Sequence, residues 1–114
     1  MEAAGKPEDR YTYADYCEWP EGGRRELVKG IPYAMAAPSE AHQIVVGEIF
    51  ERLHMHLSGK PCQVLVAPLS VRLNADEDDD AVVEPDILVV CDKSKRDGKG
   101  VVGDPDFIVE VLSH

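Results

Sequence analysis

Two short apolar stretches, each carrying one carboxylate, constrain most strongly what this chain can fold into. They are Pro85-Asp86-Ile87-Leu88-Val89-Val90 and Phe107-Ile108-Val109-Glu110-Val111-Leu112. Such runs are typical of buried strands, in which a charge is costly unless it has a partner. A divalent metal ion is one such partner, because carboxylate oxygens are hard ligands. If the two strands are neighbours in one sheet, Asp86 and Glu110 converge on one ion.

The two carboxylates differ in how strongly they indicate a site. Side chains alternate along a strand, so Glu110 shares a face with Ile108 and Leu112. A carboxylate among apolar neighbours is unusual without a function. Asp86 follows Pro85 at a strand entrance, where an Asp also simply caps a turn. The pair favours a site, whereas Asp86 alone leaves both interpretations open.

Length and charge limit the class of protein. The chain has 114 residues, enough for one small domain, and a formal net charge of −10. This charge argues against sequence-independent binding to nucleic acid, although an enzyme that meets DNA through a local basic patch and a metal ion remains open. We expect a cytoplasmic protein with no membrane contact, because residues 1–10 lack the apolar core of a signal peptide and no apolar run spans a bilayer. Residues 1–10 are expected to be a disordered tail, and residues 11–114 one domain.

The chain contains three cysteines, Cys17, Cys62 and Cys91. They are far apart, odd in number and form no C-x-x-C pair, so neither a zinc site nor a redox motif is indicated. We expect buried, reduced thiols.

Hydrophobic periodicity and breaker residues predict an α/β chain. Apolar residues at helical spacing after the N-cap candidate Ser39 predict a long helix over 40–57. The Lys29-Gly30 turn predicts an antiparallel hairpin. The expected elements are a short helix over 13–19, strands over 24–29, 31–36, 62–67, 69–73, 87–91 and 105–112, and polar loops over 74–80 and 92–103.

Two charged loops admit a functional and a simpler interpretation. The acidic run over 76–80 invites a calcium site, but it lacks the Gly and the closing Glu of an EF-hand loop, so we expect a solvated loop. The cations Lys93, Lys95, Arg96 and Lys99 are placed to touch phosphates, and the simpler interpretation is a soluble charged loop.

An ordered set of motifs resembles a known family. The set comprises Glu26-Leu27-Val28-Lys29-Gly30, His42 at the start of a helix, Val83-Glu84-Pro85-Asp86-Ile87-Leu88-Val89-Val90, and Pro105-Asp106-Phe107-Ile108-Val109-Glu110-Val111-Leu112-Ser113. It resembles the Uma-two family of restriction endonucleases, within the PD-(D/E)XK nuclease superfamily. The resemblance covers Tyr11 to Ser113.

The resemblance implies a restriction-endonuclease-like fold, a mixed β-sheet flanked by helices. It also implies a site for Mg²⁺ or Mn²⁺, with Asp86 and Glu110 at the two metal-binding positions. His42 and Glu26 would approach the same pocket. The alternatives are an exposed or loop-bonded His42, and a cross-strand ion pair of Glu26 with a residue such as Arg24 or Lys29.

The chain also departs from the family pattern. A standard E-x-K motif would place Lys at position 112, where this chain has Leu112. Family members of this type carry the Lys on a later helix, and the sequence ends at His114, so we expect a domain truncated at its C-terminus. The first hypothesis is a metal-dependent endonuclease that hydrolyses DNA phosphodiester bonds. The alternative is a non-catalytic binding or assembly module of the same fold, and we expect a homo-oligomer formed through apolar surface over 109–112.

Overall fold

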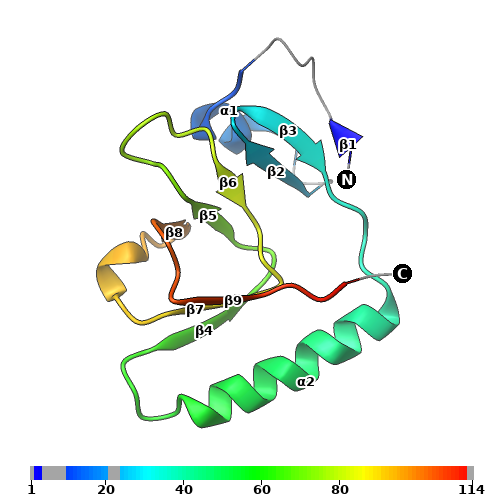
Figure 1. Ribbon diagram of the computed structural model, residues 1–114, viewed down its shortest axis with the longest axis vertical. Helices are drawn as coiled ribbons and strands as arrows, with labels where there is room; N and C mark the ends of the chain where they lie inside the picture. The colour runs from blue at the N-terminus through cyan, green and yellow to red at the C-terminus, as the bar shows by residue number, and fades with distance from the viewer. Residues whose placement is uncertain (1, 4–9, 21–23, 113–114) are drawn as a thin grey trace.

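The computed structural model describes residues 2–3, 10–20 and 24–112. It has a mixed α/β architecture, as predicted, with two sheets and one long helix (Figure 1). Within the described residues the larger sheet has the strand order β1-β3-β2-β6-β5-β8, and the smaller has the order β4-β7-β9. The strands are β1 (Glu2–Ala3), β2 (Arg25–Val28), β3 (Ile31–Ala34), β4 (Gln63–Val66), β5 (Ser70–Arg72), β6 (Val82–Val83), β7 (Ile87–Val90), β8 (Gly100–Val102) and β9 (Phe107–Val109). The helices are α1 (Tyr13–Glu18), α2 (Glu40–His56) and the 3₁₀ turn η1 (Lys93–Lys95).

The predicted hairpin is confirmed by the antiparallel pairing of β2 with β3. Its turn residues Lys29 and Gly30 both have positive φ angles, of 51° and 76°, as a tight hairpin turn requires. In the predicted N-terminal tail, Glu2–Ala3 forms β1 and pairs with β3. The rest of that tail before Arg10 lies outside the described residues.

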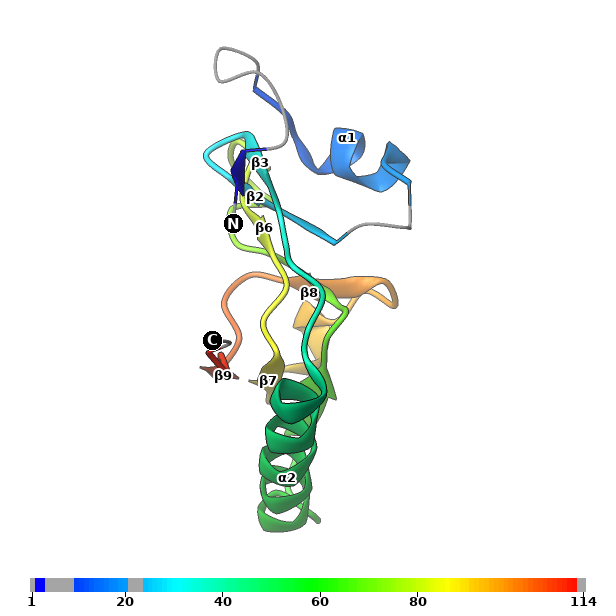
Figure 2. The ribbon, with the colours of Figure 1, turned by 90° about the vertical axis from the view of Figure 1, so that its right-hand side faces the viewer.

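Helix α2 covers one face of the smaller sheet. It begins at the predicted N-cap, where the Ser39 side chain accepts a hydrogen bond from the His42 backbone N–H. Val46 of the helix packs against Val64, Ile87 and Val89 of the strands. Figures 1 and 2 show the helix running along the smaller sheet, with its first turn on the side where the chain's C-terminal strand ends.

Strand β7 is buried on both faces, which explains its continuous apolar sequence. Ile87 and Val89 face α2, whereas Leu88 and Val90 pack with Val71 and Val101 of the larger sheet. β7 therefore joins the two halves of the core, and β4 and β9 flank it as antiparallel neighbours.

The expectation of a polar loop over 92–103 was wrong in one part. Residues Gly100–Val102 form β8, which pairs in parallel with β5. The three-residue strand is too short to produce a periodic signal, and its one fully buried side chain, Val101, is surrounded in sequence by glycines and cations.

The expectation of reduced, buried thiols was also wrong. Cys62 and Cys91 form a disulfide, and Cys17 is exposed. In the antiparallel pairing of β4 with β7, Gln63 lies opposite Val90, so one step further the register brings Cys62 opposite Cys91. The spacing of cysteines along the sequence carries no trace of this register.

Candidate functional site

The ends of β7 and β9 bring Asp86 and Glu110 together. In this antiparallel pair Ile87 lies opposite Val109, so the next positions outward are Asp86 and Glu110. Directly opposite residues of an antiparallel pair have side chains on the same face. Both carboxylates line one cavity of about 200 Å³, together with His42 and Arg24.

Asp86 is buried and held from two sides. Its Oδ2 accepts a hydrogen bond of 2.8 Å from the Val111 backbone N–H and lies 3.2 Å from Nε2 of His42. Its backbone carbonyl accepts a bond from the Ala67 N–H. The carboxylate is therefore positioned by two segments of the chain, and the Asp86 backbone by a third.

His42 faces the site from the first turn of α2, as the family resemblance implies. Its Nδ1 lies 2.9 Å from Oε1 of Gln43, and its Nε2 faces Asp86. A neutral imidazole donates from one nitrogen only, so two acceptor partners favour the charged, doubly protonated ring. The hydrogen bond to Gln43 and then the charge of Asp86 raise the pKa of His42 above its ordinary value. Burial lowers this pKa, but by less than the raising contributions together.

Glu110 titrates differently from an isolated glutamate. Burial is the largest cause of its raised pKa, followed by repulsion from Asp86 and then from Glu26, while Arg24 and His42 act in the opposite direction. A cation bound between the carboxylates would relieve this repulsion.

The donor set limits which metal fits. Within residues 2–3, 10–20 and 24–112, no group of three or more His, Cys, Asp or Glu side chains is arranged to hold a metal ion. Two carboxylates alone suit Mg²⁺, which keeps several waters and binds through one or two carboxylates and a substrate phosphate. Asp86 and Glu110 are the residues that fit such an ion.

Glu26 approaches the site in a way that differs from the expected ion pair. Its Oε2 accepts a hydrogen bond of 2.7 Å from the Glu84 backbone N–H. It also lines, with Glu110, a second cavity beside the site. Glu26 thus supports the Glu84-Pro85-Asp86 segment through its carboxylate.

Sequence reasoning missed a buried polar cluster around Glu84. Its carboxylate is 3.2 Å from Nε of Arg24 and accepts a 2.6 Å hydrogen bond from the Tyr16 hydroxyl. Burial, and then the Glu84 hydrogen bond, raise the pKa of Tyr16. The one available signal was that Glu84, like Asp86, is a carboxylate adjoining a buried apolar run.

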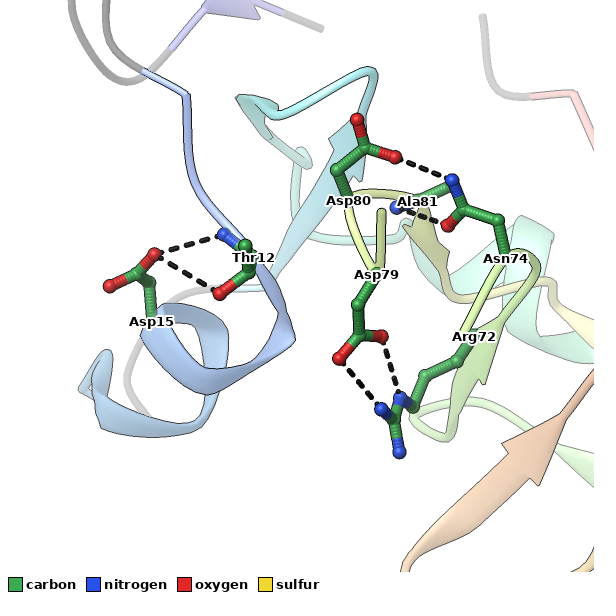
Figure 3. A network of polar contacts seen from close by, with 7 residues as sticks. All are labelled: Thr12, Asp15, Arg72, Asn74, Asp79, Asp80 and Ala81. Atoms are coloured by element: carbon green, nitrogen blue, oxygen red, sulfur yellow. Dashed lines mark hydrogen bonds and ion pairs between the residues drawn. The ribbon is translucent and has the colours of Figure 1, made fainter. Parts of the chain in front are cut away.

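The acidic loop is held by hydrogen bonds and an ion pair among its own residues and Arg72 (Figure 3). Asp79 forms a bidentate ion pair with Arg72, with hydrogen bonds of 3.0 and 2.7 Å. The Asn74 amide donates to Asp80 and accepts from the Ala81 N–H. These contacts occupy two of the loop's carboxylates, while Asp76, Glu77 and Asp78 are exposed.

The basic loop has mixed roles. Lys95 donates to the backbone carbonyl of Asp104, so its ammonium is used within the loop. Lys99 instead lines a larger cavity near α1. Asp106 accepts a 2.7 Å hydrogen bond from the backbone N–H of Cys91, the residue that follows β7.

Comparison with known proteins places the chain in a family. The sequence profile of Uma2, described as "Putative restriction endonuclease", matches residues 13–114. No curated protein sequence matches the chain. A crystal structure of "a putative nuclease belonging to DUF820" from Anabaena variabilis superposes with a TM-score of 0.68 at 18% sequence identity, which shows a shared fold. The match covers 90% of this chain and 58% of that one. Among the described residues, no helix is long and apolar enough to cross a bilayer.

Proposed function

Since this chain belongs to the Uma2 family of restriction endonucleases, we propose that it is a metal-dependent endonuclease that hydrolyses DNA phosphodiester bonds. The observation that carries the proposal is the facing pair Asp86 and Glu110 at the matching ends of β7 and β9. We propose Mg²⁺ or Mn²⁺ as the cofactor, DNA as the partner and the cytoplasm as the location.

Asp86 and Glu110 have different roles at this site. Asp86 offers a carboxylate whose position is fixed by His42 and the Val111 N–H. Glu110 would be the second carboxylate to hold the cation, whose charge would oppose the repulsion from Asp86 that helps to raise the pKa of Glu110. A bound metal ion supplies an activated water and neutralises charge on the phosphate.

A second candidate function is a non-catalytic binding or assembly module of the same fold. The observation that favours it is Leu112, which stands at the E-x-K lysine position and is 78% exposed. No lysine therefore adjoins Glu110 on its strand to orient an attacking water. The two candidates share the metal site and differ in whether DNA is cut.

Thermal unfolding with and without Mn²⁺ tests the metal site. We expect millimolar Mn²⁺ to raise the melting temperature of the parent by mass action. Asp86→Asn and Glu110→Gln should each abolish the rise, whereas Asp78→Asn, in the exposed acidic loop, should retain it. A parent that shows no rise, or a rise that Asp86→Asn leaves intact, would remove the basis of the proposal.

Incubation with plasmid DNA then separates the two candidates. Nicking that needs Mg²⁺ or Mn²⁺ and is lost in Asp86→Asn supports the endonuclease. A metal-dependent rise in melting temperature without any nicking supports the non-catalytic module.

A further inference from the structure

The larger cavity near α1, which Lys99 lines, lies outside the candidate metal site. Its volume is about 520 Å³, and α1, the start of β2, residues 68–70 and Lys99 enclose it. Figure 2 shows α1 to one side of the strands β2, β3 and β6 of the larger sheet. Neither Asp86 nor Glu110 lines this cavity.

The charges in this cavity contrast with the acidic chain around it. Three cations line it, Arg24, Arg25 and Lys99, against one carboxylate, Glu84. Arg24 and the Tyr16 hydroxyl already hold that carboxylate. Within the described residues Arg25 and Lys99 form no ion pair, so the cavity keeps positive charge in a chain of net charge −10. An anionic ligand is what such a cavity attracts.

Aromatic rings line the same cavity. Trp19 packs edge-on against Tyr16 with ring centroids 5.7 Å apart, and the Arg25 guanidinium lies 5.5 Å from the centroid of the indole. Flat rings next to cations bind the two halves of a nucleotide, because a base stacks on the ring while the phosphate meets the cation. A ligand with only a phosphate would leave the rings unused.

Arg24 connects this cavity to the candidate metal site. Its side chain lines both cavities, and the Glu84-Pro85-Asp86 segment runs from one to the other. A strand whose phosphate lies at Asp86 and Glu110 would pass along Arg24 toward the cavity that Trp19 lines. In duplex DNA the neighbouring base would be stacked and paired, so it must be unpaired to enter.

We propose that this cavity binds an unpaired nucleotide of the DNA strand adjacent to the phosphate at the metal site. The preferred DNA is therefore single-stranded, or carries an unpaired stretch, at the site of binding. This inference rests on the proposed function for the identity of the ligand as DNA.

The fluorescence of Trp19, the one tryptophan of the chain, tests the proposal directly. The probe is a short oligodeoxythymidylate without metal, compared with a duplex of equal length. We expect saturable quenching by the single strand and at least tenfold weaker binding of the duplex. No saturable quenching, or equal affinity for the two DNA forms, would overturn the proposal.

Variants locate the binding to the cavity. Arg25→Ala and Lys99→Ala should each weaken binding and reduce the salt dependence of log K by about 0.7, the value for one phosphate contact on a single strand. Lys60→Ala removes an exposed cation at the far end of α2 and should change neither. Trp19→Ala, followed with a labelled oligonucleotide, should weaken binding roughly tenfold, as loss of one stacked base does. Unchanged affinity in Arg25→Ala and Trp19→Ala would contradict the proposal.

Failure of this inference is distinguishable from failure of the proposed function. Quenching without any metal-induced rise in melting temperature would uphold the cavity and reject the metal site. A metal-induced rise in melting temperature without quenching would uphold the metal site and reject the cavity.

Discussion

Nε2 of His42 lies 3.2 Å from Oδ2 of Asp86, although the two residues are 44 positions apart in the chain. The same oxygen accepts the Val111 N–H, so one carboxylate ties the first turn of α2 to the ends of β7 and β9. These contacts hold the Asp86 carboxylate of the candidate metal site in place without a bound ion. They also make the site sensitive to the charge of His42.

Stability should fall as the pH rises through the titration of His42. Its pKa is raised in the folded state above the ordinary value of 6.5, so its stabilising effect is complete below pH 6.5 and is lost as the pH rises through the folded-state pKa. Urea unfolding across pH 6 to 9 measures this loss. In His42→Gln the fall in this range should disappear, and a parent whose stability is flat there would contradict the prediction. The raised pKa of Glu110 also makes stability fall, beginning as the pH rises from its ordinary pKa of 4.5.

The pair Arg24 and Glu84 should be strongly coupled. Glu84 is 4% exposed, and Arg24→Ala would leave its buried carboxylate without a cation. Breaking a buried pair in this way costs about 3 kcal/mol. Urea unfolding of Arg24→Ala, Glu84→Gln and the double variant forms a thermodynamic cycle. The double variant should be more stable than Arg24→Ala, and strictly additive effects would show that the pair is not coupled.

The features predicted from the sequence are those that depend on local patterns. Helix α2 and the hairpin at Lys29-Gly30 follow from spacing and turn chemistry, and β7 follows from its apolar run. The facing of Asp86 and Glu110 follows once the two strands are neighbours.

The missed features depend on long-range register. The pairing of Cys62 with Cys91 requires knowing which residues of β4 and β7 are opposite, and no local pattern contains this. The contacts of Glu84 with Tyr16 and Arg24 join segments 68 and 60 residues apart. Side chains that meet only through tertiary structure leave no periodic signal in the sequence.

Reduction of the Cys62–Cys91 disulfide should destabilise the fold. The two cysteines are 29 residues apart, and closing a loop of this length typically contributes about 2–4 kcal/mol. The variant with both residues changed to Ser should unfold at lower urea than the oxidised parent and match the parent in reductant, whereas Cys17→Ser should not shift. Identical unfolding of oxidised and reduced parent would contradict this. Thiol labelling of protein from cells would show which form a reducing cytoplasm maintains.

Two glycines should respond to alanine in opposite ways. A Cβ at Gly100 would overlap the backbone oxygen and hydroxyl of Ser70, because β8 and β5 approach closely there. We expect Gly100→Ala to lower the free energy of unfolding by about 2 kcal/mol. Gly47 lies exposed within α2 with open space around it, so Gly47→Ala should raise stability by up to about 1 kcal/mol. Chemical denaturation measures the free energy of unfolding of both variants. If Gly100→Ala is as stable as Gly47→Ala, β5 and β8 move apart to accept the new Cβ at no cost in stability.

The exposed edge of the smaller sheet should make the protein self-associate. β9 is the edge strand, and the side chains of Phe107 and Leu112 beside it are 54% and 78% exposed. An uncovered apolar edge is a template for pairing with a second chain. Light scattering should give a mass above that of the 12.6 kDa chain. Phe107→Lys should return it to a monomer, because a charge on an edge strand opposes such pairing.

Met55→Lys provides the matched control for this prediction. Met55 is 69% exposed on α2, away from β9, so the change adds the same charge to an equally exposed apolar position. Association should persist in this variant if β9 forms the contact. A parent that is monomeric at all concentrations, or a Met55→Lys variant that dissociates as Phe107→Lys does, would show that the edge of β9 is not the interface.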